Sequence, residues 1–196
     1  SYAGRDITRL AKDSSLRPAN VDMQIIFQDP FSSLNPRMRV RDIIAEPVVF
    51  HGMASADEAR YLAEEVVQKV GLDQNAGGKY PHQFSGGQRQ RICIARTLVM
   101  RPRFLICDEP TSALDVSIQA SLLNLLKDLQ EDLGLTMLFI SHDLAVIRQM
   151  CDRIAVMRYG ELCEVADSEA LFENPRHEYT QELLRLMPKF SREVAA

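Results

Sequence analysis

Two adjacent carboxylates, Asp108 and Glu109, directly follow the uninterrupted apolar run Phe104–Cys107. Such a run is typical of a strand buried in a parallel sheet, and open parallel sheets bind their ligands at the carboxyl ends of the strands. There the first carboxylate can hold Mg²⁺ through water, and the second can orient and deprotonate an attacking water molecule. A helix cap or a surface turn would use the same residue types, so the pair is a weak signal by itself.

A second group, Ser85-Gly86-Gly87-Gln88, has the composition of an anion-binding helix start. Serine is a preferred N-cap residue, and the two glycines leave bare backbone amides where the predicted helix 88–99 begins. These N–H groups and the positive end of the helix dipole suit a phosphate. An ordinary glycine-containing loop with a capping serine is the alternative. Three arginines on the same helix favour the phosphate interpretation: Arg89, Arg91 and Arg96.

Three further polar residues stand at the ends of predicted elements. Gln28 follows the predicted strand 21–27, and its amide can meet a metal ion or a water molecule. His142 follows the predicted strand 136–140, where it could hydrogen-bond a phosphate. Asp115 precedes a long amphipathic helix and is by default its N-cap. Taken alone, each of the three is an ordinary polar residue at the edge of a loop.

Hydrophobic periodicity predicts the elements that position these residues. Two apolar strands with a long amphipathic helix between them predict a parallel sheet with helices on both faces. The stretch from Pro30 to Val99 shows no strand pattern and predicts a helical insertion, irregular up to Pro36 and with a helix that stops at Pro47. The predicted strands are 21–27, 104–107 and 136–140, the helices are 41–47, 56–70, 88–99, 116–133 and 143–150, a hairpin joins 153–157 to 161–165, and the tail is helical around a break at 174–175.

The order of these motifs resembles the ATPase domain of ABC transporters over nearly the whole chain. It runs from a glutamine after a strand, through Ser-Gly-Gly-Gln at a helix start, to an apolar strand with Asp-Glu and a later strand with Ser-His. The resemblance implies an α/β fold with a P-loop NTPase-like parallel-sheet core and an α-helical insertion specific to ABC proteins. Four parts are expected: a remnant of the N-terminal core that ends in the Q-loop (1–29), a helical subdomain with the signature motif (30–99), a RecA-like core (100–166) and a C-terminal tail (167–196).

The resemblance also implies a role for each candidate residue, with ATP and Mg²⁺ as cofactors. Gln28 corresponds to the Q-loop glutamine, 85–88 to the signature, Phe104–Asp108 to the Walker B strand, 112–115 to the D-loop and His142 to the switch histidine. The expected catalytic residues are Glu109, His142 and Gln28, the expected nucleotide-binding residues are Ser85, Gly86, Gly87, Gln88 and Asp115, and the expected Mg²⁺ ligands are Asp108 and Gln28.

Three segments resemble the ATPase subunits of oligopeptide and dipeptide importers more narrowly: 27–36, 80–84 and 174–180. Glu178 stands where that subfamily usually has proline. The resemblance implies ATP hydrolysis coupled to peptide import by a cytoplasmic protein, peripheral on the inner face of the cell membrane. The implied partners are a second ATPase subunit, in a homodimer or heterodimer, and membrane permeases. Some relatives carry an iron–sulfur cluster in the tail, but the tail here has no cysteine, so none is expected.

The permease-docking surface is expected on 28–36 and the helices up to Val70, because the chain leaves the core after Gln28 and enters the helical insertion. Phe31 and Leu34 are apolar residues in a loop broken by proline, and we expect them to be exposed to a short permease helix. The alternative is that both pack into the domain's own core.

The family also requires a Walker A loop, G-x-x-x-x-G-K-[ST], whose amides and lysine wrap the phosphates of ATP. None of the five lysines precedes serine or threonine, and only Lys79 follows a glycine. The chain therefore looks truncated at its N-terminus, and we expect it to be inactive alone. In the family, ATP lies between the Walker A loop of one subunit and the signature of the other, so this chain keeps the half-site that closes over a partner's ATP.

Composition limits the other possibilities. A net charge of −4 gives no basic field for a nucleic acid, and no apolar run approaches the roughly 20 residues that span a bilayer. The four cysteines form no C-x-x-C pair and are expected to be buried thiols.

Three alternatives to peptide import stay open. The first is an importer ATPase for another substrate, such as nickel or glutathione. The second is a member that acts on DNA or ribosomes, which the short, cysteine-free stretch between Gln28 and Ser85 argues against. The third is a catalytically dead interaction module, if the lack of a Walker A loop is natural. The sequence does not reveal the transported substrate.

Overall fold

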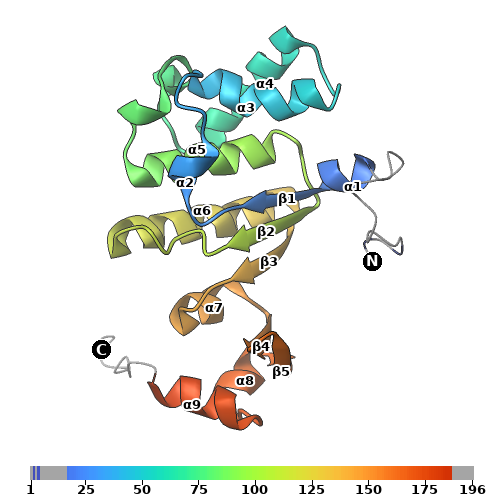
Figure 1. Cartoon of the computed structure of the whole chain (residues 1–196), viewed down its shortest axis with the longest axis vertical. Helices are drawn as coiled ribbons and strands as arrows, with labels where there is room; N and C mark the ends of the chain where they lie inside the picture. The colour runs from blue at the N-terminus through green and yellow to red at the C-terminus, as the bar shows by residue number, and fades with distance from the viewer. Residues whose placement is uncertain (1, 3, 5–16, 187–196) are drawn as a thin grey trace. The chain divides into compact units, whose positions relative to one another are not determined.

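A computed structural model of the chain describes residues 2, 4 and 17–186, apart from the side chains of 17–19 and 31 (Figure 1). It divides into two compact units, Ser1–Ile140 and Ser141–Ala196, and each is described by itself below. The four-part division expected from the family resemblance stays a prediction. Among the described helices, none has both the length and the apolar character needed to cross a bilayer.

A three-stranded parallel sheet forms the centre of the first unit. Its order is β1 (Met23–Ile26), β2 (Phe104–Asp108) and β3 (Thr136–Ile140), so β2 is the middle strand, as its apolar sequence requires. Ile25 pairs with Ile106, which pairs with Leu138 on the other side. The predicted parallel sheet is therefore confirmed.

The two faces of this sheet are covered unequally. Leu105 and Cys107 of β2 and Phe139 of β3 are buried. Leu138 and Ile140 point to the opposite face and stay 48% and 44% exposed. Among the described residues, the expectation of helices on both faces is met for one face only.

Two long helices follow the predicted pattern. Helix α5 (Gly86–Leu98) lies between β1 and the helices of the insertion, and it packs against α6 (Val116–Leu133) (Figure 1). Leu122, Leu126 and Leu129 form the buried stripe of α6, which begins and ends where the periodicity predicts. Gly134 ends the helix with φ +62°, a conformation that favours glycine.

The insertion between β1 and β2 contains helices and loops but no strand, as predicted for residues 30–99, all of which the structure describes. It contains α2 (Pro30–Ser33), α3 (Val40–Phe50), α4 (Ala56–Lys69) and the 3₁₀ turns η2 (Gln74–Gly78) and η3 (Pro81–Gln83). Helices α3 and α4 pack against each other and against α5, and their buried residues include Ile43, Ile44, Ala63 and Val67. Helix α4 begins at a capping box of Ser55 and Glu58.

Three local predictions are wrong. Helix α3 does not stop at Pro47, because buried residues before and after it, Ile44 and Val48, hold the helix through the one missing hydrogen bond. The first two residues of the predicted strand 21–27 belong instead to α1 (Arg17–Asp22). Pro30 opens a helical turn rather than only breaking structure, since a proline is tolerated at the first helical position.

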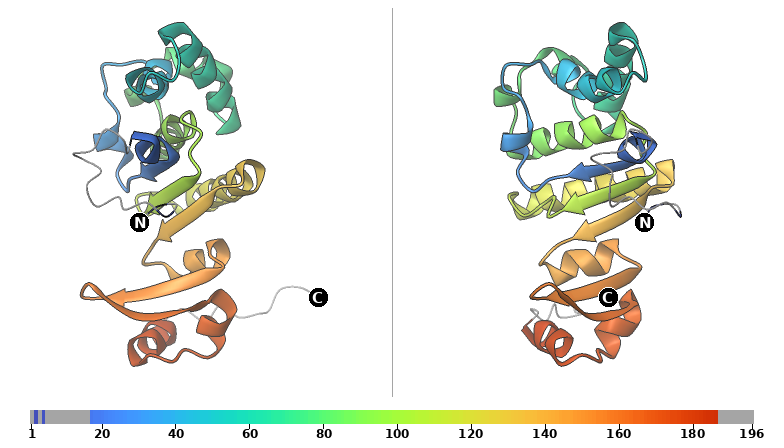
Figure 2. Two further views of the ribbon diagram at one scale, coloured as in Figure 1. Left: turned by 90° about the vertical axis from the view of Figure 1, so that its right-hand side faces the viewer. Right: turned by 45° about the vertical axis from the view of Figure 1, so that its right-hand side comes forward.

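The second unit is a hairpin with helices around it. It consists of α7 (Leu144–Met150), β4 (Arg153–Arg158), β5 (Glu161–Asp167), α8 (Ser168–Glu173) and α9 (Glu178–Leu186). Tyr159 and Gly160 both have positive φ, as a two-residue hairpin turn requires, so the predicted hairpin is confirmed. Helix α8 packs on both strands and α9 on β5 (Figure 2).

Candidate functional site

The two carboxylates lie at the carboxyl edge of the sheet, as predicted. Asp108 is the last residue of β2, and Glu109 follows it with φ +45°, an unfavourable conformation for a residue with a Cβ. The backbone N–H of Glu109 donates to Ile140 O, 3.0 Å away at the end of β3. The neighbouring strand thus holds Glu109 in this conformation, and such held outliers cluster at functional sites.

Gln28 meets Glu109 although 81 positions separate them in the sequence. Its Nε2 donates to Oε2 of Glu109 over 3.1 Å, because β1 and β2 are neighbours and both residues follow their carboxyl ends. An amide donor next to a carboxylate fixes the orientation of the carboxylate. The pair can therefore present a fixed base to a water molecule.

The turn after Glu109 is held by its own backbone. Ser112 donates from both Oγ and N to Glu109 O, at 3.1 and 3.3 Å. The turn leads to Asp115, which occupies the N-cap position of α6 as predicted. The exposed carboxylate of Asp115 makes no capping hydrogen bond, so it stabilises the helix start only through the dipole.

The segment 85–88 starts α5 with a capping box. Gln88 N donates to Ser85 Oγ over 3.4 Å, and Ser85 N donates to Gln88 Oε1 over 3.0 Å. The helix begins at Gly86, two residues earlier than predicted. Both capping side chains are exposed, and they hold the bare amides of the helix start in place.

The two glycines of this segment differ in what surrounds them. A Cβ at position 87 would lie 2.4 Å from Ile118 Cγ2 on α6, which is shorter than any tolerable contact. A Cβ at position 86 would meet Leu114 Cδ2 at an ordinary 3.6 Å. Packing between α5 and α6 therefore explains the glycine at 87 and leaves the one at 86 unexplained.

The arginines of α5 make contacts other than those expected. Arg89 Nε donates to Pro81 O over 2.8 Å, Arg91 donates to Val70 O and to Ser121 Oγ, and Arg96 donates to Ser33 O. These guanidinium groups hold the surrounding loops to the helix. The support that these arginines were expected to give to a phosphate site stays a prediction.

The sequence pattern of the family described as ABC transporter matches residues 1–112, more than half of the chain. The chain belongs to the ABC transporter family.

Named relatives agree with this family. The oligopeptide transport ATP-binding protein AppF of Bacillus subtilis (strain 168) is 49% identical over 187 residues, which is 95% of this chain and 57% of AppF. The oligopeptide transport ATP-binding protein OppF of the same organism is 50% identical over 188 residues, 95% of this chain and 62% of OppF. The chain thus spans less than two thirds of these relatives.

A solved structure confirms the fold class. It is cbiO1 from Clostridium perfringens, described as part of the ABC transporter complex cbiONQ. Its TM-score is 0.73 at 28% identity, over 90% of this chain and 68% of that one. The predicted α/β fold with a parallel-sheet core is therefore that of an ABC transporter ATPase.

The sequence did not predict the contacts that attach the loop after β1 to α5 in this ABC transporter family member. Gln90 Nε2 donates to Phe27 O over 3.4 Å, and Cys93 Sγ lies 3.2 Å from Ser33 Oγ. Burial raises the pKa of the Cys93 thiol, so it stays protonated at neutral pH. A glutamine on the helix face that carries Cys93 and Ile94 was the available signal, because a polar group on such a face is normally hydrogen-bonded.

Two other expectations concern residues outside this group. His142 is exposed, follows β3 and belongs to the second unit, and its expected hydrogen bond to a phosphate stays a prediction. Leu34 is only 4% exposed, which contradicts its expected place on a docking surface, since it packs into the core of its own unit. The side chain of Phe31, the other member of that pair, lies outside the described residues.

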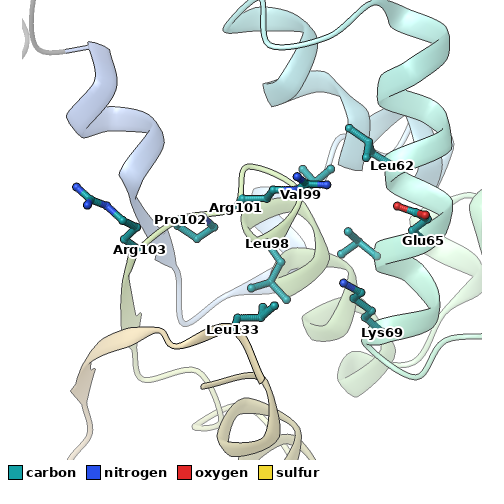
Figure 3. Close-up of a pocket in the computed structure, with 10 residues that line it drawn as sticks. Leu62, Glu65, Lys69, Leu98, Val99, Arg101, Pro102, Arg103 and Leu133 are labelled. Carbon is teal, nitrogen blue, oxygen red and sulfur yellow. The ribbon is translucent and has the colours of Figure 1, made fainter. Parts of the chain in front are cut away.

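A pocket of about 410 Å³ lies elsewhere in the first unit (Figure 3). Leu62, Glu65 and Lys69 line it from α4, facing the Leu98 end of α5, and Leu133 closes it from α6. Its walls are mainly aliphatic, and none of the predicted site residues lines it. The pocket is therefore separate from the carboxyl edge of the sheet.

Proposed function

We propose that this chain forms part of the ATP-binding and ATP-hydrolysing subunit of an ABC importer for peptides. The observation that carries the proposal is the hydrogen bond between Gln28 and Glu109 at the carboxyl edge of the sheet. The names of the relatives, oligopeptide transport ATP-binding proteins, support peptides as the substrate class.

In this proposal Glu109 is the general base. Its carboxylate accepts a proton from the water that attacks the terminal phosphate, and the amide of Gln28 keeps the carboxylate oriented toward that water. The strained backbone at Glu109 fixes the direction in which the side chain leaves the sheet. His142 is proposed to hydrogen-bond the same phosphate.

The donor set at this edge fits Mg²⁺. Mg²⁺ prefers oxygen ligands and keeps several water molecules, and the carboxylate of Asp108 and the Oε1 oxygen of Gln28 are such ligands. The bond from Nε2 of Gln28 to Glu109 leaves Oε1 uninvolved in that contact. When bound, the ion would neutralise charge on the phosphates.

The signature segment 85–88 is proposed to bind the ATP held by a second subunit. Ser85, Gly86, Gly87 and Gln88 would contribute the helix start, and Asp115 would lie at the same contact between subunits. We propose a homodimer or heterodimer, membrane permeases as further partners, and a location at the inner face of the cell membrane that follows from this role.

The test uses a fusion, called the loop-bearing form, in which the N-terminal segment of AppF precedes Ser1. The loop-bearing form should hydrolyse ATP, and Glu109→Gln should lower turnover by about 10²–10⁴-fold because an amide cannot accept the proton. Binding of ATP should persist, and sizing chromatography with ATP should show a dimer. Near-normal turnover of Glu109→Gln would remove Glu109 from this role, and an inactive loop-bearing form would favour an interaction module.

A further inference from the structure

Gln90 is a residue of α5, the signature helix, and its buried side-chain amide meets the loop that carries Gln28. It lies in the second turn of α5 and is 1% exposed. Its Nε2 donates to Phe27 O over 3.4 Å, longer than a usual N–H···O bond. Its Oε1 is buried and has no hydrogen-bond partner among the described residues.

This arrangement leaves the amide half satisfied. Burial of Oε1 costs free energy because the atom has lost its water and gained no donor. A position of the loop that brings a donor to Oε1 would recover that free energy. The backbone N–H groups of the loop that already meets Gln90 at Phe27 could supply such a donor. Gln90 therefore has a reason to prefer a second position of the loop.

The rest of the loop is attached to the same helix. Arg96 donates to Ser33 O, and Ser33 Oγ lies 3.2 Å from Cys93 Sγ. The segment from Phe27 to Ser33 is thus tied to α5 at both of its ends. Gln28, next to Phe27, reaches Glu109.

We propose that Gln90 is a positioning residue that links the signature helix to the catalytic base through the backbone of the Q-loop. In the position seen here it donates to Phe27 O, and in the ATP-engaged position its Oε1 also accepts a backbone N–H of the loop. A shift of α5 then moves Gln28 relative to Glu109. The inference rests on the proposed ATPase function and names a residue that acts on the same site.

The kinetic test compares Gln90→Met with Thr97→Val in the loop-bearing form. Methionine keeps the length of the side chain but cannot hydrogen-bond as the amide does. Thr97 is a matched control, because it is buried in the same helix and its hydroxyl donates only within α5, to Ile94 O over 2.7 Å. We expect Gln90→Met to lower kcat about tenfold with KM within about twofold, and Thr97→Val to change neither by more than about twofold.

A double-mutant cycle separates positioning from stability. If Gln90 acts through Gln28, Gln90→Met should have little further effect on kcat in a Gln28→Ala background. Equal effects of Gln90→Met in both backgrounds, or a Gln90→Met variant no slower than Thr97→Val, would overturn the proposal. An inactive parent would instead contradict the proposed function.

The tether itself can be tested in the 196-residue chain without ATP hydrolysis. Modification of Cys93 by a thiol reagent, followed by peptide mass spectrometry, reports how firmly the loop covers α5. Gln90→Met should speed this modification about tenfold relative to Thr97→Val. If Gln90→Met does not fold, the same measurement is made on the loop-bearing form without substitutions. A non-hydrolysable ATP analogue should change the rate at which the thiol reagent modifies Cys93. An unchanged rate would overturn the proposal.

Discussion

Gly86 and Gly87 are adjacent in the sequence, but their surroundings in the fold differ. Gly87 is buried against Ile118, where a side chain has no room. Gly86 has room for a methyl group and a negative φ, so nothing in the fold of the first unit demands glycine there. In the proposed function, a ligand that approaches the backbone would account for the missing side chain at Gly86.

Substitution by alanine should separate these two demands. Gly87→Ala should destabilise the chain by about 1–3 kcal/mol, because Ile118 is β-branched and cannot swing away. Gly86→Ala should leave stability unchanged or raise it by up to about 1 kcal/mol, since alanine is the better helix former. Urea denaturation of the two variants measures this difference. Equal stability of the two would refute the packing account of Gly87, and full ATPase activity of Gly86→Ala in the loop-bearing form would refute the ligand account of Gly86.

At the scale of elements, Glu164 of β5 fixes the start of α9. Its two carboxylate oxygens accept the backbone N–H groups of Arg176 and His177, at 2.9 and 3.0 Å. The buried hydroxyl of Thr180, followed by these N–H groups and the charge of His177, lowers the pKa of Glu164. One side chain of β5 therefore fixes the two residues that lead directly into α9.

The lowered pKa gives this contact a pH dependence of known sign. A carboxyl group whose pKa is lower in the folded state stabilises the fold above its unfolded pKa, about 4.3, and loses that contribution as the pH falls through the folded value. Glu164→Gln should remove the dependence and speed amide exchange at Arg176 and His177 about tenfold at pH 7. Hydrogen exchange followed by mass spectrometry measures this, with Glu161→Gln on the same strand as the control. Equal protection in both variants would show that Glu164 does not hold α9.

The helical insertion offers a different apolar surface from the one the sequence suggested. Leu34 is buried, whereas Phe50 at the end of α3 is 83% exposed, and its ring meets that of His51 edge-on with the centroids 5.2 Å apart. Val49 and Met53, close to Phe50 in the sequence, are 43% and 46% exposed, and neighbouring exposed apolar side chains are typical of a protein contact. We therefore predict the contact with a permease at the end of α3 instead of at Leu34.

Cysteine crosslinking tests this placement in the loop-bearing form assembled with its permease partners. Cysteine at position 50 should crosslink efficiently to cytoplasmic loops of the permease, and cysteine at position 34 should crosslink poorly because it is buried. Cysteine at Glu64, exposed on α4, serves as the control for random proximity. Stronger crosslinking from position 64 than from position 50 would show that the end of α3 is not the contact.

At the scale of the whole molecule, the phosphate contacts of an ABC ATPase come from more than one place. In the proposed function the carboxylates of the first unit would act on ATP, and the signature would close over the ATP of a partner subunit. Within the 196 residues, no G-x-x-x-x-G-K-[ST] segment supplies the amides and the lysine that hold the phosphates before reaction. Ground-state binding and catalysis should therefore be separable in this chain.

The 196-residue chain should bind Mg-ATP weakly. Without the phosphate loop most of the ground-state contacts are lost, so we expect a Kd above about 1 mM, against roughly micromolar values when the binding free energy is near −8 kcal/mol. Isothermal titration calorimetry of the chain and of the loop-bearing form measures this difference. Micromolar affinity of the chain alone would mean that its phosphate site lies elsewhere.

The sequence by itself determined the order of the elements and the residues at their ends. The apolar runs 104–107 and 136–140, the stripe of α6 and the turn at Tyr159-Gly160 are local patterns, and each formed where it was predicted. Local patterns failed at Pro47 and Pro30, where packing and helix position outweighed the general effect of proline. Asp108 and Glu109 could be placed at the end of β2 from the sequence, because the apolar run before them marks where the strand ends.

Only the tertiary structure decided which distant residues meet. The bond from Gln28 to Glu109 depends on β1 and β2 being neighbours, and the tie from Gln90 to Phe27 depends on which face of α5 turns toward the sheet. The burial of Leu34 and the close approach of Gly87 to Ile118 likewise arise where separate helices pack together. Such contacts join residues far apart in the chain. Periodicity and turn chemistry act over a few residues, so they cannot predict these contacts.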